Sequence, residues 1–103
     1  MAKYHKTTYD VVAAGDLTRP GVRLAAACID AEIPVQVVAK WIGVSRQAVY
    51  YWLTGATDVA RRHIDKVERI TDVLLDALDA NELPAEDLET ALAVVKRYRS
   101  KKS

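Results

Sequence analysis

Four side chains that could read DNA bases lie close together in the sequence, at Arg46, Gln47, Tyr50 and Tyr51. An arginine can donate two parallel hydrogen bonds to guanine, and a glutamine can pair in a similar way with adenine. The two tyrosines can reach phosphates or the methyl group of thymine. A helix with a purely structural role would more often expose Glu, Lys and Ala, so this combination favours a DNA-binding surface.

The surrounding stretch, 34–55, is predicted to form two short helices joined by a tight turn. Apolar residues recur at the spacing of one helix face, and the inward positions are Val35, Val38, Ala39, Ile42, Val49 and Trp52. Gly43 is expected to end the first helix, because glycine adopts the left-handed conformation without a Cβ penalty. Ser45 is expected to cap the second helix, which would begin at Arg46, because its hydroxyl can accept a hydrogen bond from a free backbone N–H.

This arrangement resembles the helix-turn-helix of the lambda-repressor-like (Xre-type) DNA-binding family over the stretch 34–55. The family has a small residue where the two helices cross and a glycine in the turn, which Ala39 and Gly43 match. The apolar places around them are taken by Val38, Ile42, Val44, Val49 and Trp52. Gly55 stands where such repressors often end the recognition helix. Val35 is a soft departure, because the family often has a polar residue there that touches phosphate, and Gln36 is the nearest candidate.

The resemblance implies an all-α protein of about five helices that regulates transcription, for instance as a repressor, by binding double-stranded DNA. The second helix of the pair would enter the major groove with its N-terminus first, while the first helix crosses the phosphate backbone. The side chains expected to contact DNA are Gln36, Lys40, Ser45, Arg46, Gln47, Tyr50, Tyr51 and Thr54. A phage or mobile-element origin, and therefore the bacterial host cytoplasm, is a further expectation from the likeness to phage repressors.

Charge is distributed unevenly along the chain, although the net charge is only +1. Residues 1–57 carry six Lys/Arg and four Asp/Glu, a balance of +2. Residues 58–95 carry four Lys/Arg and ten Asp/Glu, a balance of −6, whereas residues 96–103 carry five Lys/Arg and no acid. The acidic segment should face away from phosphate, and the helix-turn-helix and the basic C-terminus could face it.

The predicted organisation is a single compact domain. Its first part, 1–57, would hold a short arm at 1–6 that either frays or contacts DNA, a helix at 9–14, a helix starting at 18–20 and the reading pair. The second helix after the arm would bury Val22, Ala25, Ala26 and Ile29, flanked by Leu24 and Cys28. The part 58–98 would form a helical hairpin, and 99–103 a basic tail.

The first helix of that hairpin, at about 58–80, would be capped by Thr57 or Asp58. Its apolar positions cover an arc about twice the 100° that an ordinary surface helix needs. The central stripe is Ala60, His63, Val67, Ile70, Leu74 and Leu78, and the flanks are Val59, Ile64, Val73, Leu75 and Ala77. Either the helix lies between two layers of its own bundle, or a second copy covers part of the arc, which predicts a homodimer or larger homo-oligomer. The second helix, 85–98, would fold back antiparallel to it.

Enzymatic and metal-dependent functions find no support in the sequence. The chain has one cysteine and two histidines, His5 and His63, that are far apart and lack partners at metal-ligand spacing. No catalytic triad, phosphate-binding glycine loop or carboxylate pair is apparent, and we expect no enzyme activity, metal, cofactor or small-molecule ligand. Without a bilayer-spanning run or a signal-peptide hydrophobic region, we expect a cytoplasmic protein with no membrane partner.

Two other functions remain open at this point. A helix-turn-helix followed by a helical hairpin and a basic tail is also similar to small phage terminase subunits, which form rings and mark DNA for packaging. Alternatively, the helix-turn-helix is a protein-interaction module, for instance for a polymerase or a second regulator. Particle mass separates the first two functions, and salt-dependent DNA binding separates both from the third.

Overall fold

The computed structural model describes residues 18–102, and these residues form helices with no strand among them. The five helices are α2 (Pro20–Ala31), α3 (Val35–Ile42), α4 (Arg46–Thr54), α5 (Arg61–Asp79) and α6 (Leu88–Lys102). The all-α prediction is therefore confirmed. The arm predicted at 1–6 and the helix predicted at 9–14 lie outside the described residues.

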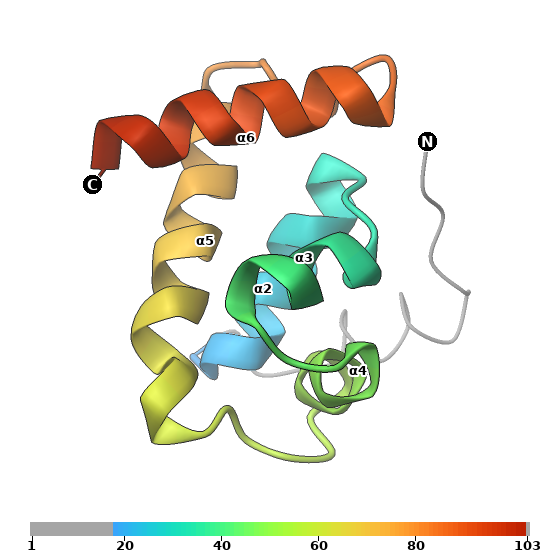
Figure 1. Cartoon of the computed structure of the whole chain (residues 1–103), viewed down its shortest axis with the longest axis vertical. Coiled ribbons are helices and arrows are strands. Elements are labelled where there is room, and N and C mark those ends of the chain that lie inside the picture. The colour runs from blue at the N-terminus through green and yellow to red at the C-terminus, as the bar shows by residue number, and fades with distance from the viewer. Residues whose placement is uncertain (1–17, 103) are drawn as a thin grey trace.

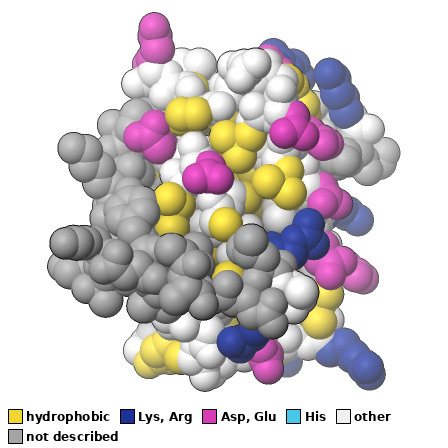
Figure 2. Space-filling view, turned by 180° about the vertical axis from the view of Figure 1, so that it is seen from behind, with side chains coloured by type: hydrophobic (Ala, Val, Ile, Leu, Met, Phe, Trp, Pro, Cys, Tyr) yellow, Lys and Arg dark blue, Asp and Glu magenta, His cyan; other side chains and the backbone are white. Residues whose placement is uncertain are grey.

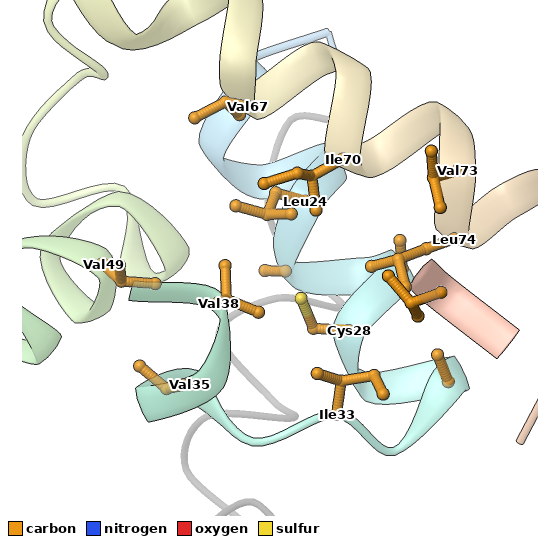
Figure 3. Close-up of a cluster of buried hydrophobic side chains, with 14 of the residues drawn as sticks. Leu24, Cys28, Ile33, Val35, Val38, Val49, Val67, Ile70, Val73 and Leu74 are labelled. Atoms are coloured by element: carbon orange, nitrogen blue, oxygen red, sulfur yellow. The ribbon is translucent and has the colours of Figure 1, made fainter. Parts of the chain in front are cut away.

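The helices surround one apolar core to which α2 to α6 all contribute (Figure 1). The long helix α5 runs along one side, α2 and α3 fill the middle, and α4 lies below them in this view. Figure 3 shows the centre of the core, where Leu24 and Cys28 of α2 point toward Val38 of α3 and Ile70 of α5. Burial in this core raises the pKa of the Cys28 thiol to about 12, so the thiol stays protonated and unreactive at neutral pH.

Helix α2 begins close to its predicted start, but its buried face is centred differently. Pro20 occupies the first turn, where its missing N–H costs nothing. Leu24 and Cys28 are fully buried, whereas Ala26 and Ile29, which were expected in the central stripe, are only half-buried. The exposed side of α2 carries Arg23 and Asp30, which are seven residues apart, and Ala26 lies between them on the same side, so the stripe of apolar residues alone misplaces the buried face.

Helix α5 begins at Arg61, later than predicted, and neither Thr57 nor Asp58 caps it. Ala60 occupies the N-cap position without a side-chain hydrogen bond, and it is exposed rather than part of the buried stripe. The Asp58 carboxylate is instead engaged by Arg19, whose Nη2 lies 2.6 Å from Asp58 Oδ1. The Asp58 side chain, which the local sequence pattern predicts to cap α5, therefore forms an ion pair with Arg19 instead.

The wide apolar arc of α5 is covered largely by the protein's own helices. α5 packs against α2 and also against α6. Val73 and Ala77 on the flank of the arc are fully buried, Ile64 and Leu78 are half-buried, and Leu75 is exposed, with 37% of its surface accessible. The explanation that the helix lies between two layers of one bundle therefore accounts for most of the arc, and the arc alone no longer requires a second copy.

Helix α6 differs from the prediction in both its limits and its direction. Asp87 precedes it, and its Oδ1 accepts a hydrogen bond from the Thr90 backbone nitrogen at 2.8 Å, which holds the pKa of the Asp87 carboxyl below its usual value. The helix continues to Lys102, so the predicted basic tail is helical over 99–102. Figure 1 shows α6 lying across α5 rather than running back along it, so the predicted antiparallel hairpin is wrong.

The loop between α5 and α6 fixes this crossing. Asn81 has a positive φ of 60° and turns the chain out of α5. From the same loop, Glu82 accepts hydrogen bonds from Arg97 and from the Tyr98 hydroxyl. Its carboxylate thereby ties the C-terminal half of α6 to the end of α5. Between residues 18 and 102, no helix combines the length and apolar character needed to span a bilayer.

Candidate nucleic-acid interface

The turn between α3 and α4 has the conformation that its sequence predicts. Gly43 ends α3 with a φ of 87°, and its nitrogen lies 2.8 Å from the carbonyl oxygen of Ala39. The nitrogen of Val44 also donates to Ala39, at 3.1 Å. Because a positive φ is strained for residues with a Cβ, glycine is the residue that lets the chain reverse here at little cost.

Ser45 caps α4, as predicted. Its backbone is extended, and its Oγ accepts a hydrogen bond from the Ala48 nitrogen at 3.1 Å. The cap satisfies one of the backbone donors that every helix N-terminus leaves free. At the other end, Gly55 stops α4 with a φ of 78°. Helix α4 is therefore fixed at both ends by residues that the sequence identified.

One face of α4 is anchored in the core. Val49, Trp52 and Leu53 are buried, and the Trp52 ring packs against the His63 ring of α5 with 5.9 Å between centroids. On the other side, α2 approaches so closely that a Cβ placed at Gly21 would lie 2.8 Å from both the Cβ and the carbonyl oxygen of Trp52. These contacts fix the rotation of α4 about its own axis and hence which residues face outward.

All eight residues predicted to contact DNA lie on the surface of α3, α4 and the turn. Gln36, Lys40, Ser45, Arg46, Gln47, Tyr50, Tyr51 and Thr54 are all exposed. Tyr50 and Tyr51 expose 38% and 45% of their surface. Gln47 Nε2 donates to the Tyr51 hydroxyl at 2.8 Å, and the Thr54 hydroxyl donates to the Tyr50 carbonyl at 3.0 Å. The bond between Gln47 and Tyr51 orients both side chains one helical turn apart on the outward face.

The charge around this surface is positive but sparse. The stretch 34–57 contains Lys40 and Arg46 as its only cations and has no Asp or Glu. Lys66 of α5 adds a third cation near the turn, because its Nζ lies 3.5 Å from the Ile42 carbonyl oxygen at the end of α3. Figure 2 shows a different charge on the opposite face, where Asp and Glu side chains lie among apolar ones in the upper part of the view. That region would repel phosphate.

Two positioning residues were missed by sequence reasoning. Arg19, at the start of α2, donates through Nε and Nη2 to Asp58 at 3.1 and 2.6 Å, and through Nη2 to the Gly55 carbonyl oxygen at 3.3 Å. It thereby joins the end of α4 to the start of α2. Lys66 was likewise treated only as part of an acidic segment. Both act over long sequence separations, for which the local pattern carries no signal.

Substituting Gly43 by valine should destabilise the reading pair through backbone strain. A Cβ at this position meets no atom within 4 Å, so the cost arises from the positive φ and not from a clash. We expect a loss of about 1–3 kcal/mol in the free energy of unfolding, measured by urea denaturation, together with weaker DNA binding. Gly43→Asn should lose less, because asparagine tolerates this conformation. An unchanged urea denaturation curve for the valine variant would show that the turn has a different conformation.

The sequence-predicted contact residues are thus all exposed on α3, on α4 and at the turn between them, and α4 is capped and anchored in the core. Thr54 lies at the end of α4 remote from the N-terminal Arg46, so the set spans the whole helix. Comparisons of the chain with models of protein families, with curated proteins and with solved structures find no match.

Proposed function

We propose that this protein is a sequence-specific DNA-binding regulator that uses α3 and α4 as a helix-turn-helix of the lambda-repressor-like type. One observation carries the proposal. The capped helix α4 buries Val49, Trp52 and Leu53 while it exposes Arg46, Gln47 and Tyr51 on the opposite side. These exposed side chains have the hydrogen-bonding groups that read base edges in the major groove.

In the proposed complex the N-terminal end of α4 enters the major groove. Arg46 donates to guanine and Gln47 pairs with adenine, with Tyr51 supporting the glutamine through the hydrogen bond described above. Gln36 and Lys40, exposed on α3, contact the phosphate backbone and set the position of the helix. The absence of Asp and Glu from the stretch 34–57 and the positive end of the helix dipole favour this approach of the anionic duplex.

Two copies are proposed to act together on DNA. A single reading pair presents only Lys40 and Arg46, with Lys66 nearby, so each copy gains little electrostatic attraction. In a two-fold dimer the recognition helices would lie about 34 Å apart and contact half-sites separated by one turn of DNA or a multiple of it. Leu75 is the most exposed large apolar residue of the arc on α5, and such a contact could form there.

We prefer a regulator to a DNA-packaging subunit, because the similarity to packaging subunits included a helical hairpin after the helix-turn-helix. Since α6 lies across α5, that feature gives it no support. A protein-interaction module is compatible with the two exposed tyrosines, but it leaves the base-reading groups Arg46 and Gln47 without a role. Binding to DNA that weakens steeply with salt would separate the regulator from such a module.

Selection of bound duplexes from a random pool should yield a preferred site, and Arg46→Ala or Gln47→Ala should each weaken binding to it. We expect a cost of about 1–3 kcal/mol on the preferred site and far less on random DNA. Affinities at a fixed salt concentration, measured by fluorescence anisotropy, test this. Arg23→Ala, an exposed arginine on α2, is the control and should not change the ratio of the two affinities.

Equal losses on preferred and random DNA would mean that Arg46 and Gln47 contact only phosphate, which would contradict base readout. Light scattering on the same samples gives the particle mass. A dimer agrees with the proposal, a ring of eight to twelve subunits would favour the packaging function, and a monomer at tens of micromolar would overturn the dimer.

A further inference from the structure

A recess of about 760 Å³ lies between α3, α5 and α6, apart from the exposed face of α4. Its apolar wall is formed by Val37 and Trp41 of α3 and by Leu92 and Val95 of α6. The volume falls in the range of about 300–1,000 Å³ that is usual for pockets binding small organic molecules. The recess therefore has the size and the apolar lining of a ligand site.

Four cations border the recess, and they come from three different helices. They are Lys40 of α3, Arg69 of α5, and Lys96 and Arg99 of α6. No carboxylate lines the recess, and in the part of the chain from 18 to 102 none of the four cations forms an ion pair. Gathering like charges without counter-charges is unfavourable, so the arrangement is suited to an anion that neutralises them.

The recess also presents a planar platform. The guanidinium carbon of Arg99 lies 5.8 Å from the centroid of the Trp41 ring, and both groups line the same space. Indole and guanidinium planes both stack favourably on flat rings. A ligand with a flat apolar body would therefore gain from this wall, in addition to the charge contacts at the border.

We propose that this recess binds a small, flat organic anion with at least two negative charges, of which a nucleoside diphosphate is the representative class. The flat body would lie against Trp41 and the apolar wall, and the charged groups would contact Arg69, Lys96 and Arg99. The site is distinct from the base-reading face, and its occupancy requires no DNA.

The DNA backbone is a poorer match for the same residues. Phosphates on a duplex lie on a convex surface and would reach only the border cations, leaving the apolar wall and Trp41 without contacts. A free anion of the stated size uses both parts of the recess. The class of ligand follows from this combination of charge and apolar surface.

If the proposed DNA-binding function holds, the ligand also regulates it. Lys40 borders the recess and is one of the two cations of the reading pair. An anion bound beside it would reduce the attraction of α3 for phosphate, and by linkage DNA would weaken ligand binding by the same factor. This coupling rests on the proposed function, whereas ligand binding by itself does not.

Calorimetric titration of the full chain with ADP, in the absence of DNA and metal, tests the site. We expect a Kd below about 1 mM, with pyrophosphate and adenosine each binding at least about tenfold more weakly because each supplies only half of the contacts. Arg69→Ala should weaken ADP binding about tenfold. Arg61→Ala is the matched control, an exposed arginine on the same helix that does not line the recess, and it should leave the affinity unchanged.

Trp41→Leu should also lower the ADP affinity while leaving pyrophosphate binding unaffected, with the melting curve recorded to verify folding. The proposal is overturned if ADP does not bind, if pyrophosphate binds as well as ADP, or if Arg61→Ala weakens binding as much as Arg69→Ala. If ADP does not bind and both Arg69→Ala and Lys96→Ala weaken binding to a random duplex, the cations are assigned to the DNA backbone instead. ADP binding in a protein that fails to bind DNA would leave the site intact and refute only the DNA-binding function.

Discussion

Gly21→Val should lower the free energy of unfolding by about 3 kcal/mol and weaken DNA binding with it. The added Cβ would lie 2.8 Å from the Cβ and from the carbonyl oxygen of Trp52, and 3.1 Å from its carbonyl carbon. Two of these three atoms belong to the backbone of α4, so relief of the clash requires α4 to move as a unit. Urea denaturation monitored by circular dichroism measures the loss.

Two further variants separate this clash from the general cost of valine in a helix. Ala93→Val, at an exposed position of α6, should change the free energy of unfolding by only a few tenths of a kcal/mol. Gly21→Ala should still be destabilising, even though alanine favours a helix over glycine by about 0.5–1 kcal/mol. A Gly21→Ala protein more stable than the wild type would show that α2 and α4 are not in close contact.

Val73→Glu should unfold the protein or come close to it, whereas Leu75→Glu should be tolerated. Val73 is fully buried between packed helices, so its replacement leaves a charge without a partner in the core, at a cost above about 3 kcal/mol. Leu75, with 37% of its surface exposed, can place a carboxylate in water, and we expect a change below about 1 kcal/mol. Thermal melting of the two variants compares them directly.

The same pair of variants examines self-association. If the wild type is a dimer and Leu75→Glu becomes a folded monomer, the dimer contact involves this part of α5. If Val73→Glu stays folded with a wild-type melting temperature, the packing of α5 between α2 and α6 is wrong. Val73 and Leu75 are two positions apart on the same helix, so the main difference between the two variants is the burial of the substituted side chain.

The parts of this fold that could be predicted are those specified by neighbouring residues. Gly43, Ser45 and Gly55 each act through their own backbone conformation or through a hydrogen bond within one helical turn. The helical spacing of the apolar residues Val49 and Trp52 likewise predicts which side of α4 is buried. The turn, the cap and the outward face therefore follow from the sequence of the reading pair.

The parts that could not be predicted depend on residues far apart in the chain. Asp58 is a good cap by residue type, but Arg19 lies 39 residues away and forms an ion pair with it. The direction of α6 depends on contacts of Glu82 with Arg97 and Tyr98, which a stripe of apolar residues does not reveal. The recess at Trp41 escaped detection for the same reason, since three helices contribute its cations.

The two tryptophans occupy environments that differ enough to serve as separate optical reporters. Trp52 exposes only 5% of its surface and packs against His63, so its emission follows the packing of α4 on α5. Trp41 is half-buried and lies beneath Arg99 in the recess, so its emission follows events between α3 and α6. Phenylalanine at one position leaves the other tryptophan as the only indole in the chain, and excitation at the long-wavelength edge of its absorption avoids the five tyrosines. Movements of α4 and of α6 can thus be recorded independently in the same chain.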